Sequence, residues 1–328
     1  MPAIYDPLEE PVSFPFDVSP VYQHHTPLFN DNFVPKYLYR LVVSNSRRRT
    51  SGGPGNTQDI FHLPPQKAAA LLLKHLLWQT DHESGCTLMS WTSSLLFALQ
   101  YALYRHRKHG DDLSQIQLIV LDTTLFPRGT FIQDMEIMRS FQDADWRLQK
   151  FVEFRESEYY FGEYLTQGRL AIHGRSVCTS VQKMIDLGLF ELGPVLADRN
   201  HWQWWPKRVV EFREEFRSGG STTTTDEDVQ TAVDIAAQCF GGQWTVPGAI
   251  MLLALQPRNA NDEVILECFK CRFTVEQVKQ AGLDKVTVVS GRLPEVGQFK
   301  ELVGSVQRAF SLADDDPLVD SLQALTVG

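Results

Sequence analysis

Apolar and polar positions change period several times along this chain, and each period predicts an element. Short runs rich in β-branched, aromatic and other apolar residues predict strands, at 37–43, 115–122, 159–165 and 170–172. Apolar residues that recur every three or four positions predict helices, at 67–79, 95–109, 132–141, 146–154 and 176–187. Strands and helices that follow one another without a regular βαβ repeat indicate an α+β fold.

Changes in composition divide the chain into five parts. Residues 1–34 hold many prolines and isolated aromatic residues, which predicts a partly disordered N-terminal arm. We expect one domain over 35–217, and a linker over 218–226, where Ser-Gly-Gly-Ser is followed by four threonines and an aspartate. A mostly helical region is expected over 227–310, and an acidic tail over 311–328.

A hydroxyl-rich stretch, Ser90-Trp91-Thr92-Ser93-Ser94, precedes the helix expected from Leu95 to His109. Serine and threonine side chains accept hydrogen bonds from the free amide groups of a first helical turn, so we expect a turn that caps this helix. Gly110 is expected to end it. By itself the stretch predicts a helix cap, worth about 1 kcal/mol.

The charge balance limits the possible functions. The chain has 328 residues, of which 43% are hydrophobic and 22% charged, and a net charge of −9. A general nucleic-acid binder usually needs a basic face, so we expect no nucleic-acid binding. The short basic run Arg47 to Arg49 is expected to be a solvated loop tip. The tryptophans Trp202, Trp204 and Trp205 are either an anchor packed on the first domain or a surface for a partner.

Neither a membrane span nor a secretory signal is predicted. No stretch approaches the about 20 apolar residues that cross a bilayer, and residues 1–10 lack a basic segment followed by an apolar one. The five cysteines are scattered and odd in number, which favours a reducing compartment. We therefore expect a cytoplasmic protein, with a nuclear one or delivery without a signal peptide left open. A lone Cys-x-x-Cys at 268–271 predicts no metal site.

Three segments carry side chains that can act together on one ligand. Arg40 lies on the first predicted strand, and a guanidinium there is a planar clamp for a diphosphate. The hydroxyls of Ser90, Thr92 and Ser93 can bond a ribose or an amide, or orient a carboxylate. Glu163 on a later strand can accept a hydrogen bond from a sugar hydroxyl and stabilise an oxocarbenium ion. Together they predict cleavage of an N-glycosidic bond in a nucleotide that carries a pyrophosphate.

The order of these segments resembles the Arg-Ser-Glu, or cholera-toxin-like, class of ADP-ribosyltransferases. The matching segments are Tyr39-Arg40, Ser90-Trp91-Thr92 with Ala98 and Ala102, Leu118 to Thr124, and Glu163 with Gly168 five residues later. More closely, the pattern resembles fungal proteins of unassigned activity that carry a transferase-like domain. The resemblance covers roughly residues 35–200. It implies a split, mixed β-core of the ADP-ribosyltransferase type with a helical C-terminal extension.

The resemblance also implies a substrate and a role for each residue. NAD would be the substrate, and the acceptor of ADP-ribose would be a protein or another molecule, or water in an NAD glycohydrolase. Arg40 would hold the phosphates or a ribose. Ser90, Thr92 or Ser93 would shape the nicotinamide pocket, and Trp91 or Tyr101 would stack on nicotinamide. Glu163 would be the catalytic residue that bonds the ribose 2′-hydroxyl.

Two positions depart from the family's pattern. Trp91 stands where the family has a small threonine, and Phe161 stands where arginine-directed members have Glu or Gln. Phe161 therefore argues against arginine as the acceptor. Glu158 is a poor substitute for the missing Glu or Gln, because it falls on the opposite face of a continuous strand from Glu163. Both departures favour a second hypothesis, a catalytically inactive transferase-like module that serves interaction or regulation. A third hypothesis is a carbohydrate- or peptide-binding protein that uses Trp202 to Trp205.

Overall fold

The computed structural model describes residues 14–17, 34–43, 58–79, 87–289 and 291–314. Most of the expected N-terminal arm, the basic loop at 47–49 and most of the acidic tail lie outside these residues. The helices have the following bounds: α1 Pro65–Leu76, α2 Leu95–His109, α3 Asp134–Phe141, α4 Trp146–Arg155, α5 Val181–Asp186, α6 Leu189–Leu192, α7 Trp205–Arg217, α8 Asp226–Cys239, α9 Thr245–Leu253, α10 Glu263–Arg272, α11 Val275–Gln280 and α12 Pro294–Asp314. The fold is α+β, as the sequence pattern predicts.

The described strands form one six-stranded sheet in the order β4-β5-β2-β1-β3-β6. Their bounds are β1 Tyr37–Val43, β2 Leu88–Thr92, β3 Ile116–Asp122, β4 Ile132–Gln133, β5 Glu163–Gln167 and β6 Ser176–Ser180. Every neighbouring pair is antiparallel, so the expectation of a mixed sheet is wrong.

The sheet is nearly divided in the middle. Strand β1 pairs with β3 along its whole length, from Tyr37 to Val43, but it meets β2 at a single residue pair, Tyr39 opposite Thr92. Beyond that pair the two strands separate. The guanidinium of Arg40 occupies the gap, and its Nη1 donates a hydrogen bond to the Ser90 carbonyl at 2.7 Å. A side chain thus satisfies a carbonyl that the strand ladder leaves unpaired.

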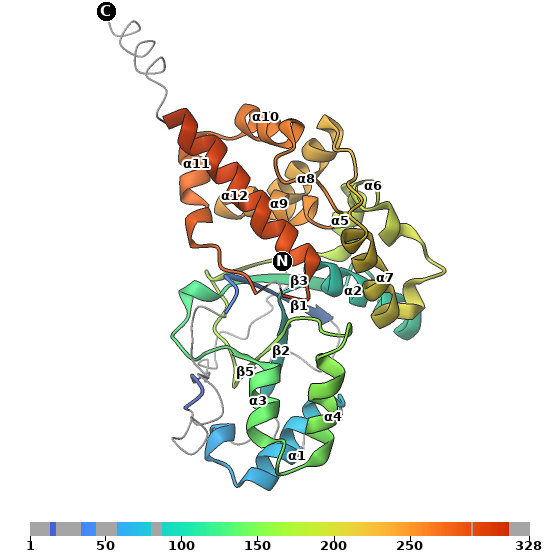
Figure 1. Cartoon of the computed structure of the whole chain (residues 1–328), viewed down its shortest axis with the longest axis vertical. Helices are drawn as coiled ribbons and strands as arrows, with labels where there is room; N and C mark the ends of the chain where they lie inside the picture. The colour runs from blue at the N-terminus through green and yellow to red at the C-terminus, as the bar shows by residue number, and fades with distance from the viewer. Residues whose placement is uncertain (1–13, 18–33, 44–57, 80–86, 290, 315–328) are drawn as a thin grey trace, which may run out of the picture.

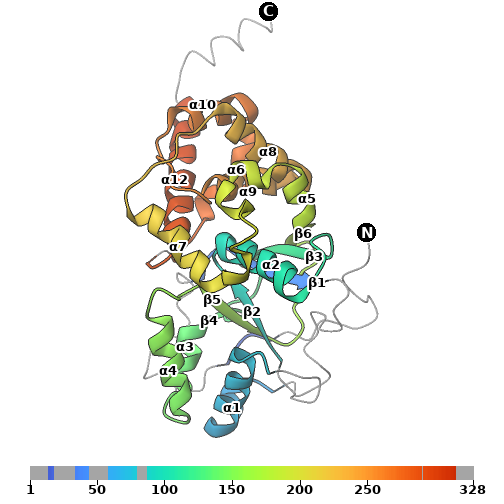
Figure 2. The same ribbon diagram turned by 90° about the vertical axis from the view of Figure 1, so that its right-hand side faces the viewer.

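Helices cover the sheet in two groups (Figures 1 and 2). Helices α1, α3 and α4 lie beside the β4-β5-β2 half, and α8 to α12 gather at the opposite end of the molecule. Alternate residues of each strand enter different cores, as the pleat requires. Tyr39 and Val120 pack under α2 and the C-terminal helices, whereas Leu38 and Ile119 pack on the other face with Trp91.

Four local predictions are wrong, the first because the strand expected at 159–165 begins only at Glu163. Ser90 and Thr92 lie on strand β2 rather than in a turn, and only Ser94 caps α2, accepting a hydrogen bond from the Phe97 amide at 3.1 Å. Residues 176–180 are strand β6, not the start of a helix, because they pair with β3. Residues 170–172 form no strand.

The C-terminal helices share a core with the sheet. One cluster of buried side chains extends from Tyr37 on β1 through α2 to α8, α9 and α12, where Phe310 belongs to it. The segment 218–225 has no helix or strand, and helix α8 begins directly after it, capped by Thr225. Residues 226–311 therefore pack on the first part of the chain rather than forming a core of their own.

Candidate functional site

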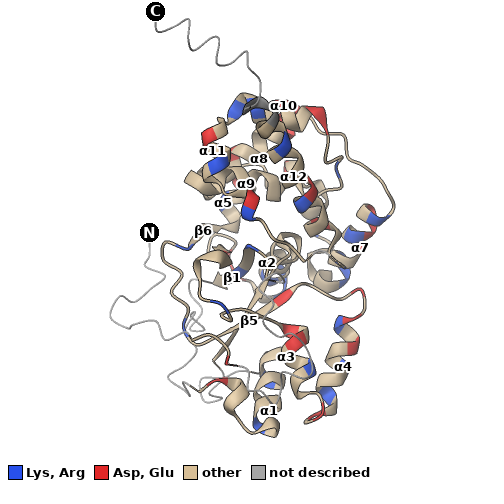
Figure 3. Ribbon diagram, turned by 60° about the vertical axis from the view of Figure 1, so that its left-hand side comes forward, with Lys and Arg blue, Asp and Glu red and all other residues tan. Residues whose placement is uncertain are grey.

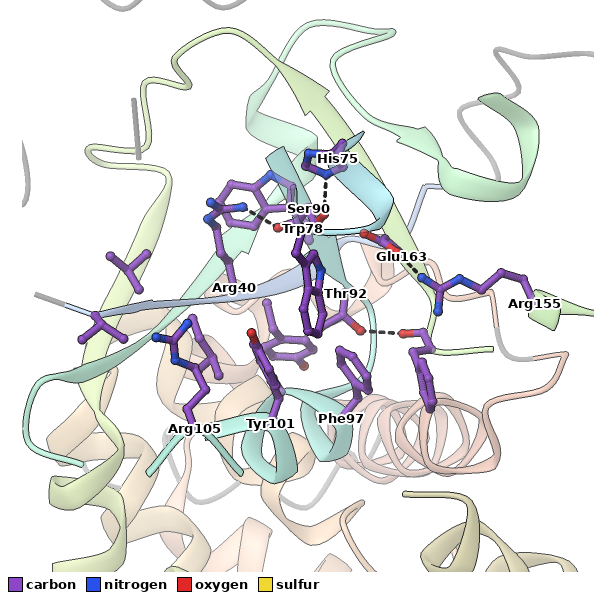
Figure 4. Close-up of a pocket in the computed structure, with 17 residues that line it drawn as sticks. Arg40, His75, Trp78, Ser90, Thr92, Phe97, Tyr101, Arg105, Arg155 and Glu163 are labelled. Atoms are coloured by element: carbon purple, nitrogen blue, oxygen red, sulfur yellow. Dashed lines mark hydrogen bonds and ion pairs between the residues drawn. The ribbon is translucent and has the colours of Figure 1, made fainter. Parts of the chain in front are cut away.

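A cavity of about 660 Å³ opens where β1 and β2 separate. Its walls come from β1, from β2, from one face of α2 and from the end of α1, as Figure 4 shows. Six of the residues expected at the site line this single cavity: Arg40, Ser90, Trp91, Thr92, Tyr101 and Glu163. The seventh, Ser93, is not among its lining residues. Residues far apart in the sequence thus meet in one pocket of the size that small-molecule ligands occupy.

Arg40 is a cation without a counter-ion among the described residues. It is half-buried, and its Nε atom is buried without a hydrogen-bond partner. Burial lowers the pKa of its guanidinium to about 10, although Tyr101 opposes this change. The guanidinium also lies over the Trp91 ring, 5.8 Å from its centroid. A buried cation of this kind favours an anionic ligand, whose charge would offset the cost of burial.

The hydroxyl groups of β2 have different roles. Ser90 Oγ lies in the cavity and is 2.8 Å from His75 Nε2. Thr92 Oγ1 donates to the Phe161 carbonyl at 2.6 Å and accepts from the Ser94 amide at 3.1 Å, so it ties β2 to the segment before β5. Ser90 is therefore the hydroxyl best placed to meet a ligand.

His75 was not predicted at the site, because its position in the sequence carries no motif. It lies near the C-terminal end of α1 and reaches the cavity beside Ser90. Burial lowers its pKa to about 4, with Glu163 opposing the change and Arg40 adding to it. The imidazole is therefore neutral at pH 7 and can hold the Ser90 hydroxyl in one orientation.

Glu163 begins strand β5 directly opposite Thr92. Its Oε2 atom pairs with Arg155 Nη2 at 2.6 Å, and its side chain is 17% exposed. Arg155 Nε in turn lies 3.1 Å from Oδ2 of Asp134, which is fully buried. Neither Arg155 nor Asp134 was expected at the site, because their chain positions carry no motif. The pairing keeps Glu163 at the wall of the cavity (Figure 4).

The segment before Glu163 is fixed by backbone contacts. Gly162 has a φ of +64°, and a Cβ atom there would lie 2.1 Å from Ser93 Oγ. The Ser93 amide donates to the Gly162 carbonyl at 2.8 Å, and Arg213 Nη1 donates to the Tyr160 carbonyl at 2.6 Å. Ser93 is thus buried against this segment, which fits only glycine at position 162.

An aromatic wall closes one side of the cavity. Tyr101 packs against Trp205, with ring centroids 4.8 Å apart, and Phe161 stacks on Phe97 at 4.5 Å. Trp78 contacts both Tyr101 and Trp205 and is 55% exposed. Trp78 has a φ of 57°, which is strained for a bulky residue and often marks a functional position.

The three tryptophans at 202–205 separate into different environments. Trp202 is buried and donates to the Leu196 carbonyl at 2.8 Å. Trp205 joins the aromatic wall. Only Trp204 is mostly exposed, at 54%. Two of the three therefore act as anchors within the protein.

The cavity is more basic than the chain as a whole. Three arginines line it, Arg40, Arg105 and Arg155, against one carboxylate, Glu163. Arg105 pairs with Asp111 at 2.7 Å. Figure 3 shows that acidic and basic residues are otherwise interspersed over the helices. Arg105 and Arg155 are each paired with a carboxylate, so Arg40 is the lining cation that favours an anionic ligand despite the net charge of −9.

Two other features are absent from the part of the chain that the structure describes. Among the described residues, no group of three or more His, Cys, Asp or Glu side chains is arranged to hold a metal ion. No helix in the described part of the chain is long and apolar enough to cross a membrane. Comparisons with protein-family models, with curated proteins and with solved structures found no match to this chain.

Proposed function

We propose that this protein cleaves the nicotinamide N-glycosidic bond of NAD, as a mono-ADP-ribosyltransferase or as an NAD glycohydrolase. One observation carries the proposal. Arg40, which has no carboxylate partner among the described residues, and Glu163 line the same cavity, with the Ser90 hydroxyl between them. A cation for a diphosphate and a carboxylate for a ribose are the two charges that this reaction requires.

The diphosphate would lie beside Arg40. Its Nη1 atom is already used by the Ser90 carbonyl, and its Nε is buried. A phosphate beside the part of the guanidinium that lines the cavity would offset its positive charge. Arg105 also lines the cavity, where it is paired with Asp111.

The glycosidic bond would lie beside Glu163. Its Oε2 atom is held by Arg155, which leaves Oε1 to accept a hydrogen bond from the 2′-hydroxyl of the nicotinamide ribose. As the bond to nicotinamide breaks, positive charge develops on the ribose, and the carboxylate stabilises it. Ser90, held by His75, and the aromatic wall would surround the nicotinamide ring. Trp91 is buried below Arg40, with its Nε1 donating to Thr166 Oγ1 at 3.2 Å, so Tyr101 and Trp78 are the better stacking partners.

The acceptor would not be an arginine side chain. The ring of Phe161 is buried and stacked on Phe97, so position 161 offers no polar group to orient a guanidinium. Water and acceptors other than arginine fit this apolar environment equally well.

The decisive experiment follows nicotinamide release from NAD by the purified full-length chain. Glu163→Gln is expected to lower the rate about 100- to 1,000-fold, because the developing charge loses its carboxylate. Glu158→Gln is the matched control, since Glu158 is an exposed carboxylate five residues earlier, and it is expected to leave the rate unchanged. Equal rates for wild type and Glu163→Gln, or no turnover with any acceptor, would contradict the enzymatic proposal.

The Arg155–Glu163 ion pair also favours a second candidate, a catalytically inactive module. If the pair holds Glu163 permanently, the cavity would bind a nucleotide without cleaving it. Titration calorimetry with NAD separates the two candidates: binding without nicotinamide release supports the inactive module, and neither binding nor release contradicts both. Arg40→Met is expected to weaken NAD binding at least about tenfold under either candidate, because it removes the charge for the phosphates.

A further inference from the structure

Arg155 is a bridge between two carboxylates. Its Nη2 atom contacts Glu163 Oε2 at 2.6 Å, and its Nε atom lies 3.1 Å from Asp134 Oδ2. The Arg155 side chain is 14% exposed, and that of Asp134 is fully buried. Burying a charge is costly unless it is paired, so the cation and the two anions must be considered as one unit.

Asp134 takes no direct part in the cavity. It begins helix α3, and its Oδ1 atom accepts a hydrogen bond from the Met135 amide at 2.8 Å. Its Oδ2 atom has no hydrogen bond of good geometry, only the nearby Arg155. Asp134 is thus a buried carboxyl group whose charge is balanced by one shared cation.

We propose that Arg155 is a positioning residue for Glu163, and that a proton on Asp134 decides how far Arg155 neutralises the Glu163 carboxylate. This inference rests on the proposed function, in which Glu163 stabilises the positive ribose. When Asp134 is ionised, Arg155 is shared and the cluster carries a net charge of −1. When Asp134 is protonated, Arg155 pairs with the Glu163 carboxylate alone and the net charge of the cluster is zero. The ionised cluster stabilises the oxocarbenium ion better.

The pKa of Asp134 lies close to neutral pH. Burial raises its pKa to about 7, with Glu163 adding to the rise and Arg155 and the Met135 amide opposing it. The titratable and charged groups around the cluster are Arg139 and Glu136 on α3, Arg155 on α4, Tyr160, Glu163 and Tyr164 on or before β5, and His75 on α1. Both tyrosines have pKa values raised by burial, and that of His75 is lowered to about 4. A pKa of about 7 means that Asp134 changes charge between pH 6 and 8.

The first test measures kcat and KM for nicotinamide release between pH 6 and 8. Wild type is expected to gain about tenfold in kcat as pH rises through 7, whereas Asp134→Asn stays at the low-pH rate throughout. Glu156→Gln is the control, because Glu156 pairs with Arg139 beside the cluster, and it keeps the wild-type profile. Arg155→Met is expected to lower kcat about 100-fold with little change in KM, and Arg155→Lys to restore part of it. A wild-type profile in Asp134→Asn overturns the inference.

The second test needs no NAD. Carbon-13 NMR of the aspartate and glutamate side-chain carboxyl groups follows the full-length wild-type protein between pH 5 and 9. The Glu163 signal, assigned from its loss in Glu163→Gln, is expected to shift in a step near pH 7 together with that of Asp134. Independent titration of the two groups overturns the inference, whatever the turnover. A coupled step without nicotinamide release leaves the cluster as inferred and contradicts the proposed function instead.

Discussion

A buried ion pair links the C-terminal helices to the candidate site, and its removal gives the sharpest stability prediction. Arg213 on α7 is completely buried, and Glu295 on α12 is 4% exposed. Arg213 Nη2 donates to Glu295 Oε1 at 2.7 Å, and Nε lies 3.1 Å from Oε2. The same carboxylate accepts a hydrogen bond from Ser94, the cap of α2, at 2.6 Å. Arg213 also holds the Tyr160 carbonyl, three residues before Glu163.

Glu295→Gln leaves a buried guanidinium without its counter-charge. Breaking such a pair typically costs about 3 to 5 kcal/mol of unfolding free energy. Because the hydrophobic core is continuous across α2, α7 and α12, we expect one cooperative transition at a lower denaturant concentration with an unchanged slope. Urea unfolding followed by tryptophan fluorescence measures both quantities.

Two further variants complete this test. Glu214→Gln removes an exposed ion pair with Arg217 on α7, the helix that carries Arg213. It is expected to change the free energy of unfolding by less than about 0.5 kcal/mol. The double variant Arg213→Met with Glu295→Leu removes both charges and is expected to cost less than Glu295→Gln alone. A loss below about 1 kcal/mol in Glu295→Gln would refute the reasoning, since it would mean that water reaches the Arg213 guanidinium.

Three other predictions concern the site itself. Gly162→Ala should destabilise the protein by about 2 to 4 kcal/mol, because position 162 has a positive φ and a Cβ there clashes with Ser93. Adding Ser93→Ala should recover only the part of this loss that comes from the clash. A double-mutant cycle measured by thermal unfolding tests both expectations. His75 gives an acid sensitivity. Because the pKa of His75 is lowered in the folded protein, the unfolded chain binds a proton at a higher pH than the folded chain does. The free energy of unfolding therefore falls by up to about 3 kcal/mol as the pH drops from 6.5 to 4. The urea midpoint of His75→Asn should fall less than that of wild type over the same range. Trp91→Phe removes the donor to Thr166 and should cost about 1 to 3 kcal/mol in urea unfolding. A wild-type urea midpoint would count against the buried hydrogen bond.

Local pattern was sufficient for the long elements of the fold. The apolar run at 116–122 became strand β3, and the hydroxyl-capped run at 95–109 became α2, ended by Gly110 with a φ of 73°. The failure at 176–180 has a clear cause. Ser-Val-Cys-Thr-Ser is a weak strand signal, and its conformation is fixed by pairing with β3, about 60 residues away in the chain.

The sequence by itself determined the α+β class, the order of the main elements, and the set of Arg40, Ser90 and Glu163 as candidates, because chemistry and hydrophobic period are readable from neighbouring residues. Their meeting in one cavity was decided by the separation of β1 from β2, a tertiary feature. The hydroxyl-rich stretch that looked like one motif was also divided by the fold, with Ser90 in the cavity and Ser93 buried against Gly162.

Only the tertiary structure could supply His75, Asp134 and Arg155. Their positions carry no motif, and each acquires its character from burial and from a partner far along the chain or on another element. The pKa of Asp134 rises and that of His75 falls because water is excluded from both. Desolvation and the distance between charges depend on the folded chain alone, so no pattern of residue types could have shown that a single arginine joins Asp134 to Glu163.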